Sequence, residues 1–290
     1  MSVHYEHVNE YTSNDILVYD YLWARDEEHA KLIKPARIHL WQVSMPKSGT
    51  VWLSRMLSFL FEGDEWRIIK LAGCYSETEI NHRAILEFPE KNIFSPSSHT
   101  VMSPYVFSLI NLFRIKPFLQ VRNILDIMAS LKDHISQIES EEAADIFTSK
   151  RYSPMEVELK LFFSQCAPQW KRLTDKEKNT FVVDFVFPVV LRIFVSWFRT
   201  KNRCNYLQIS YEELSKDTAG TIEKILDFAG LEDFKPGIDR VIERVSGKRT
   251  HFNKGKIGRG QEVFSSENID RMRGMTGYYP EVDFRALGLR

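Results

Sequence analysis

Residues 44–52 constrain this chain more than any other segment, because they read as a turn between a strand and a helix. An apolar run, residues 38–43, comes before them, and apolar residues at helical spacing follow from Trp52 to Leu60. A turn of small residues leaves backbone N–H groups at the positive end of the helix, where an anion binds favourably. Lys47 adds a positive charge at the same place, so the segment predicts an anion-binding turn.

The spacing of this turn is not that of the common P-loop, in which the lysine follows two glycines separated by four residues. Here the lysine precedes a single glycine. Residues 46–52 instead resemble the 5′-phosphosulfate loop, Pro-Lys-Ser-Gly-Thr-Thr-Trp, of sulfotransferases that use 3′-phosphoadenosine-5′-phosphosulfate (PAPS). An ordinary strand–helix turn with an exposed lysine is the alternative. The resemblance implies that PAPS is bound by Lys47, Ser48, Gly49, Thr50, Val51 and Trp52, with the indole beside the adenine.

A second segment combines a strand-like run, residues 118–121, with Arg122 at its end and Ser130 eight residues further on. Arginine suits phosphate because its planar fork donates two parallel hydrogen bonds. With Asn123 and Asp126 between them, these residues resemble the 3′-phosphate signature of the same family. The resemblance implies that Arg122 and Ser130 hold the 3′-phosphate of PAPS. The alternative is an arginine in a surface ion pair and a serine that caps a helix.

Two further segments agree with this family. Residues 211–214 resemble its Tyr-Glu-Asp/Glu-Leu segment, which implies that Tyr211 lies near the adenine, although a buried aromatic closing a strand fits as well. Residues 253–258 resemble Arg-Lys-Gly-x-x-Gly, with Asn253 in place of the arginine. The resemblance implies that Lys254 and Gly255 bind the cofactor from a glycine-rich loop, residues 248–264. The missing charge could come from Lys254, Lys256 or Arg259.

A general base is needed if the acceptor is a hydroxyl, and histidine titrates near neutral pH. Where cytosolic members of the family carry Lys-Thr-His, this chain reads Ser97-Ser98-His99. The resemblance therefore implies that His99 is the base, with His134 as the reserve candidate, whereas a lone loop histidine is often only a surface residue. Because Ser97 replaces a lysine, Lys47 is expected to stabilise the leaving oxygen largely alone.

Strand-like runs at residues 38–43, 118–121 and 206–209, and a shorter one near 92–94, alternate with helical patterns such as 218–229. This alternation predicts an α/β fold with a central parallel β-sheet and helices on both faces. The resemblance implies the P-loop NTPase-like sulfotransferase architecture, as a single domain over residues 1–290. Residues 1–35 are expected to form an acceptor-side extension. The acidic residues 136–154 are a possible lid over the acceptor, or else a solvated loop or helix face.

Composition narrows the function further. Lysine plus arginine and aspartate plus glutamate both number 39, and this zero net charge argues against a general nucleic-acid binder. The three cysteines are scattered and the eight histidines show no ligand spacing, so we expect no disulfide framework and no metal site. The acidic N-terminus does not resemble a signal peptide, so the cytoplasm is the expected compartment.

The most apolar stretch, residues 181–198, contains Asp184, Pro188 and Arg192, which a membrane span would bury at a cost. We therefore predict no membrane span there, but a short strand or turn followed by a core helix that begins near Pro188.

Together these resemblances imply an enzyme that moves a sulfuryl group from PAPS to a hydroxyl or amine and releases 3′-phosphoadenosine 5′-phosphate (PAP). The expected acceptor is a small molecule such as a specialised metabolite, no metal is required, and the protein is expected to be a monomer or homodimer. Two other hypotheses stay open: a catalytically inert PAPS- or PAP-binding module, and a divergent nucleotide or metabolite kinase. The kinase hypothesis predicts a Mg²⁺-binding carboxylate after a strand, which is not evident.

Overall fold

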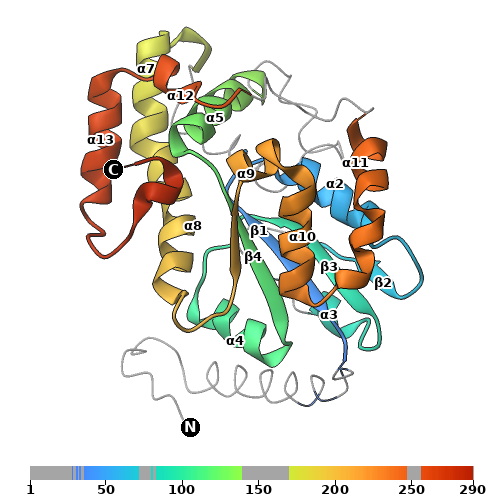
Figure 1. Ribbon diagram of the computed structural model, residues 1–290. Coiled ribbons are helices and arrows are strands. Elements are labelled where there is room, and N and C mark those ends of the chain that lie inside the picture. Colours follow the sequence, from blue (N-terminus) through green and yellow to red (C-terminus); the bar gives the residue numbers. More distant parts are fainter. Residues whose placement is uncertain are drawn as a thin grey trace, which may run out of the picture.

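The computed structural model describes residues 36–71, 83–138, 170–246 and 256–289, together with Glu28, Lys31, Ile33 and Ile80. Within them lies a five-stranded sheet in the order β2-β3-β1-β4-β5, in which all neighbours are parallel. The strands are β1 (His39–Ser44), β2 (Trp66–Ile68), β3 (Asn92–Ser98), β4 (Ile115–Val121) and β5 (Leu207–Ser210). The predicted α/β fold with a parallel sheet is confirmed (Figure 1).

The four predicted strands exist, and their bounds differ by a few residues. β3 is longer than the run at 92–94 suggested, because Pro96 and its neighbouring serines continue the strand to Ser98. The short edge strand β2 was not predicted. Only three residues long, with Ile68 at 44% exposure, it has no alternating or continuous apolar pattern that a sequence reading can detect.

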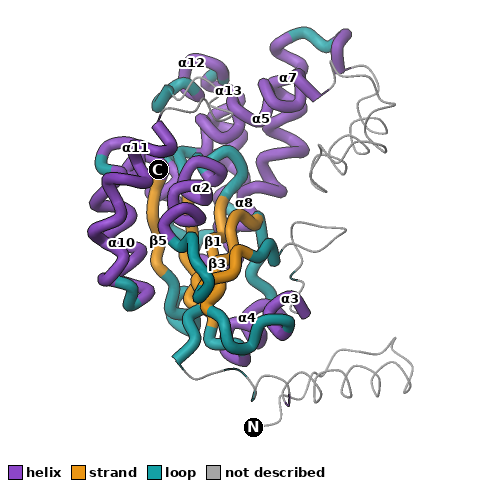
Figure 2. The backbone as a smooth tube through the Cα atoms, turned by 90° about the vertical axis from the view of Figure 1, so that its right-hand side faces the viewer, coloured by secondary structure: helices purple, strands orange, loops and turns teal. Residues whose placement is uncertain are grey.

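Helices cover both faces of the sheet. One face carries α2 (Thr50–Leu60), α9 (Tyr211–Lys216), α10 (Thr218–Ala229) and α11 (Ile238–Ser246), whose apolar residues join Leu40 and Phe118 in one core. The other carries α4 (Pro104–Leu112), α5 (Ile124–Ile138) and α8 (Phe187–Thr200), whose apolar residues join Trp41 and Leu119 in a second core. α13 (Ser266–Thr276) adds Met272 to this core and contacts residues 182–186. Figure 2 shows the strands between these two layers.

The remaining described helices are short. They are α3 (Arg83–Leu86), α7 (Asp175–Phe181) and α12 (Gly260–Val263), with the 3-10 turns Trp170–Arg172, Glu232–Gly237 and Phe284–Leu287. The caps of α10 follow the prediction: the Asp217 side chain accepts from the N–H of Gly220, and Gly230 ends the helix in the left-handed conformation. The predicted extension 1–35 and lid 136–154 fall mostly outside the described residues.

The prediction of a strand or turn before Pro188 was wrong. α7 runs through a π-helical turn, η3 (Val182–Val186), directly into α8. A proline has no N–H to donate to the preceding turn. The π turn absorbs this defect, since the N–H of Phe187 donates five residues back to the carbonyl of Val182. The helix 175–200 is long and apolar enough to cross a membrane, with mean hydropathy 2.0, but 56% of its most apolar window is buried in the protein.

Two connections from a strand to a helix determine where the candidate site lies. After β1 the chain enters α2 on one face of the sheet, and after β4 it enters α5 on the other face. β1 and β4 are neighbours in the sheet. Their carboxyl ends therefore open into a crevice where the chain leaves in two directions, which is where parallel α/β sheets bind ligands.

Candidate active site

The turn between β1 and α2 leaves the helix N-terminus without a side-chain cap. Gly49 precedes α2 in the left-handed conformation, with φ 84° and ψ 17°, and no side chain accepts a hydrogen bond there. The first N–H groups of a helix have no partner within the helix. Lys47 also has positive φ, 59°, which helps the chain to reverse so tightly. The predicted strand–turn–helix is present, and its uncapped helix start has the geometry that an anion-binding turn needs; anion binding itself stays a prediction.

The carbonyl groups of this turn point into the protein. The hydroxyl of Ser48 donates to the carbonyl of Met45 at 2.7 Å. Nη1 of Arg122 donates to the carbonyl of Lys47 at 2.8 Å, and Nε2 of Gln120 donates to the carbonyl of Ser48 at 2.7 Å. In the Ser48–Gly49 peptide, the inward carbonyl leaves the N–H of Gly49 on the opposite side, turned outward. The N–H of Ser48 itself donates to the carbonyl of Met45 at 3.3 Å, within the turn. These contacts fix the orientation of the turn before any ligand arrives.

Arg122 lies at the carboxyl end of β4 and is 8% exposed. Besides the carbonyl of Lys47, it donates from Nη2 to the carbonyl of Lys256 at 3.4 Å. Among the described residues its Nε has no hydrogen-bond partner. The ion pair of Arg122 is not a surface one, because its Nη2 lies 3.8 Å from the carboxylate of Asp126 and both side chains are buried. A buried positive group with an unused donor beside an anion-binding turn suits a second anion.

Ser130 lies on α5, two turns after its start, and is 6% exposed. Asn123 starts this helix, since its side-chain oxygen accepts from the N–H of Leu125 at 3.0 Å. Its own N–H donates to Oε1 of Glu212 at 3.0 Å, which ties the turn after β4 to the beginning of α9. The strand-to-helix turn thus sets Arg122 and Ser130 on consecutive elements, as the sequence predicted.

Asp126 has a role that the sequence pattern did not reveal. Its carboxylate accepts from the N–H of Gly258 at 2.8 Å and of Gly260 at 2.7 Å. A Cβ at Gly260 would lie 2.2 Å from the backbone of Leu125, so only glycine allows this approach. The end of the glycine-rich loop is therefore fixed beside Arg122 by a buried carboxylate. The two residues predicted to bind the cofactor from this loop, Lys254 and Gly255, lie outside the described residues.

Of the three cations proposed to replace the missing arginine, Lys256 and Arg259 have carboxylate partners, and Lys254 lies outside the described residues. Nζ of Lys256 lies 2.7 Å from the carboxylate of Glu262. Nη2 of Arg259 lies 2.7 Å from that of Asp133. Both ion pairs draw these side chains toward neighbouring helices, so neither residue is available to an anion without breaking its pair.

Tyr211 joins the two halves of the site. Its ring lies 4.3 Å from the guanidinium carbon of Arg122, a cation–π contact. A Cβ at Gly49 would meet the same ring at 2.7 Å. The ring is 4% exposed, as both the cofactor-binding and the core interpretation require. Trp52 is half-buried on the first full turn of α2 and packs against the core on that face.

His99 follows β3 directly and is 9% exposed, so it is not a surface histidine. Nδ1 lies 2.7 Å from the carbonyl oxygen of Ser44 and 3.4 Å from its hydroxyl. A carbonyl only accepts, so Nδ1 carries the proton in the neutral ring and the lone pair belongs to Nε2. Ser44 is the last residue of β1, two residues before residues 46–52, the turn predicted to bind phosphate. The histidine is thus held at that turn in the tautomer that a general base needs. His134, the reserve candidate, lies in the third turn of α5 and is half-buried.

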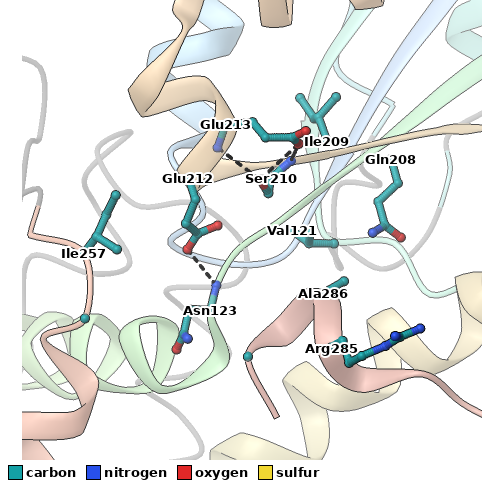
Figure 3. A pocket seen from close by; sticks show the side chains of 12 residues that line it. Val121, Asn123, Gln208, Ile209, Ser210, Glu212, Glu213, Ile257, Arg285 and Ala286 are labelled. Carbon is teal, nitrogen blue, oxygen red and sulfur yellow. Dashed lines mark hydrogen bonds between the residues drawn. The ribbon is translucent and has the colours of Figure 1, made fainter. Parts of the chain in front are cut away.

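A separate pocket of about 400 Å³ lies beside this site (Figure 3). It is bounded by the turn after β4, the start of α9, Gly258 and the C-terminal turn that carries Arg285 and Gly288. None of residues 44–52 lines it. Glu212 reaches across its edge to the N–H of Asn123, as the figure shows. This pocket therefore flanks the back of the site and does not contain the lysine or the histidine.

Among the described residues, no group of three or more histidine, cysteine, aspartate or glutamate side chains is arranged to hold a metal ion.

Comparison with known proteins identifies the family. The chain belongs to the sulfotransferase domain family, whose model matches residues 37–256. Comparison with curated protein sequences gives no match. The solved structure of mouse sulfotransferase SULT7A1 complexed with PAP is 17% identical, with a TM-score of 0.57 over 91% of this chain and 92% of that one. At this identity the likeness shows the fold alone. A structure of retinol dehydratase with androsterone and inactive cofactor PAP is 16% identical, with a TM-score of 0.43 over 90% and 88% of the chains.

Proposed function

We propose that this protein transfers a sulfuryl group from PAPS to a hydroxyl or amine of a small-molecule acceptor. The observation that carries the proposal is that two groups suited to anions lie against one ring: the uncapped start of α2 at Gly49 and the buried guanidinium of Arg122, both against Tyr211. Two phosphates at opposite ends of one nucleotide are what PAPS presents and ATP does not. The PAP bound to the similar mouse enzyme supports the same nucleotide.

The residues present fit this nucleotide. The outward N–H groups after Ser48 would hold the 5′-phosphosulfate, and Arg122 with Ser130 would hold the 3′-phosphate. PAPS supplies the sulfuryl group and, in its phosphate, the leaving group. His99 accepts the acceptor's proton at Nε2, while its Nδ1–H donates to the carbonyl of Ser44. Lys47 stabilises negative charge that develops on the leaving oxygen. A cytoplasmic location and a monomer or homodimer stay predictions.

The first prediction tests the base. His99→Ala should lower kcat by about 100-fold or more, because a positioned general base contributes roughly 10²–10⁴ in rate. PAP affinity should stay within about twofold, since the ring is placed beside the turn and not within it. The measurement is turnover of labelled PAPS over an acceptor panel, with PAP binding by calorimetry. His134→Ala is the matched control and should retain normal turnover.

The other hypotheses have their own outcomes in the same experiments. Stronger thermal stabilisation of the wild type by ATP with Mg²⁺ than by PAP would favour the kinase. Strong stabilisation by PAP without turnover on any acceptor would favour the inert binding module. Normal turnover by His99→Ala would remove this residue as the base.

A further inference from the structure

Two glutamines lie side by side inside the sheet, directly below the phosphate-binding turn. Gln42 is in β1 and Gln120 is in β4, on the face that α2 covers, since Leu40 and Phe118 two residues before them belong to that core. Both glutamines are 0% exposed. A buried primary amide is costly unless its groups are hydrogen-bonded, so their partners are informative.

The two amides form a continuous hydrogen-bonded chain to the turn. The hydroxyl of Ser54 donates to Oε1 of Gln42 at 2.7 Å, and Nε2 of Gln42 donates to Oε1 of Gln120 at 2.8 Å. Nε2 of Gln120 then donates to the carbonyl of Ser48 at 2.7 Å. A longer bond, 3.3 Å, runs from Nε2 of Gln42 to the carbonyl of Thr50. The side-chain oxygen of each glutamine is bonded, which fixes the orientation of both amides.

This orientation decides where the N–H groups of the turn point. A trans peptide is planar, with its carbonyl and N–H on opposite sides. Because Gln120 draws the carbonyl of Ser48 into the sheet, the N–H of Gly49 points away from the sheet, toward the anion. The hydrogen bond from Gln42 to the carbonyl of Thr50 likewise turns the N–H of Val51, in the same peptide, away from the sheet. Gly49 has left-handed freedom and could otherwise let this peptide rotate.

We propose that Gln120, held by Gln42, is a positioning residue that pre-orients the phosphate-binding turn for the 5′ end of its nucleotide. The proposal rests on the function proposed above for the choice of ligand, but its structural part does not. Two apolar side chains would fill the same space in the core without the cost of burying amides. The hydrogen bonds to the turn, and not packing in the core, therefore explain why glutamines occupy these two positions. Gln120 contacts the turn through the backbone carbonyl of Ser48, so it acts through the turn.

The test replaces both amides together, because removing both partners of a buried hydrogen bond leaves no unsatisfied group in the pair. The variant Gln42→Leu/Gln120→Leu should fold with a thermal midpoint lowered by several degrees, because the carbonyl of Ser48 and the hydroxyl of Ser54 lose these partners. Its affinity for PAP should fall roughly tenfold, since each N–H–phosphate bond loses its preset direction. Its affinity for adenosine 3′-monophosphate, which lacks the 5′ group, should change by no more than about twofold.

A merely structural role gives a different result. Equal losses for the two nucleotides, or no loss for PAP, would overturn the proposal. Should the double variant not fold, Ser54→Ala removes only the outermost hydrogen bond and should weaken PAP alone by about threefold; no selective loss would again overturn it.

Amide hydrogen exchange separates this inference from the function it rests on. Without ligand, exchange across residues 46–53 should be faster in the double variant, while exchange in β5 stays unchanged. If wild-type protein binds no PAP, the proposed function fails, and the exchange result alone decides on the positioning role. Faster exchange then supports it, and unchanged exchange refutes it.

Discussion

The two ends of the parallel sheet each hold one buried arginine and one buried histidine, yet only one end has the features of an active site. Arg37 and Arg122 are both 8% exposed, and each donates to two backbone carbonyls. His39 at the amino end of β1 and His99 beyond β3 are likewise buried. Burial and unpartnered donors are thus common to both ends and do not by themselves identify a site.

The difference lies in what surrounds these groups. At the amino end, Arg37 connects β1 to the carbonyls of Ile85 and Phe88. Burial lowers the pKa of Arg37 to about 10, which reflects the cost of the enclosed charge. At the carboxyl end, Arg122 faces the uncapped start of α2 across Tyr211. Both arginines hold loops, but only at the carboxyl end does the buried arginine lie beside an uncapped helix start, at the edge where parallel α/β sheets bind ligands.

The largest expected effect separates the two arginines. Arg122→Ala should weaken PAP binding by about 100-fold, because two charge-assisted hydrogen bonds to a phosphate are lost. Arg37→Ala should lower thermal stability but leave PAP affinity within about twofold. Calorimetric titration of both variants makes the comparison. Comparable losses in PAP affinity would show that the two ends are not functionally distinct.

The next effect concerns pH and belongs to the amino end. Burial, with a smaller contribution from the charge of Arg37, lowers the pKa of His39 to about 3 from its usual 6.5. The unfolded chain then binds more protons between these values, so stability is complete above pH 6.5 and falls as the pH drops. The loss should approach ~1.4 kcal/mol per pH unit. Urea unfolding from pH 7 to 4.5 measures how the free energy of unfolding depends on pH, and His39→Gln should remove this dependence. An unchanged dependence in the variant would show that groups other than His39 cause it.

The smallest effect comes from the serine beside each histidine. Ser95 is the one described partner of His39, at 2.9 Å from Nε2, so Ser95→Ala should cost about 1 kcal/mol of stability without changing kcat. Ser44→Ala leaves the stronger bond from His99 to the backbone carbonyl, at 2.7 Å. It should lower kcat only about threefold. A lower kcat in Ser95→Ala, or an unchanged kcat with lower stability in Ser44→Ala, would contradict the functional difference between the two ends of the sheet.

Sequence reasoning reached the elements whose signals are local. The strand–turn–helix around Lys47 and the caps of α10 depend on residues within a few positions of one another, and the structure has them as predicted. Contacts between residues far apart in the sequence could not be predicted from such local patterns. Asp126 accepts a hydrogen bond from Gly258, which is 132 positions away in the sequence, and no pattern near either residue indicates this contact. Gln42 and Gln120 read as ordinary strand residues until the register of β1 and β4 brings them together.

The π turn was missed for a related reason. A proline after an apolar run usually marks the start of a helix, and residues 181–187 carry the β-branched and aromatic residues that favour strands. Packing in the core stabilises this segment as a helix, since Val182, Val183 and Val186 are buried there. Tertiary contacts therefore overrode a local preference that was itself correctly identified.

For inhibitor design, the ring of Tyr211 makes the two halves of the crevice a single target. It touches both the glycine of the turn after β1 and the guanidinium after β4. Because one ring packs against both groups, a compound that moves the ring at one half is expected to alter its contact at the other, so fragments bound at either half act on the same side chain. Linking such fragments requires a scaffold that leaves the ring in place.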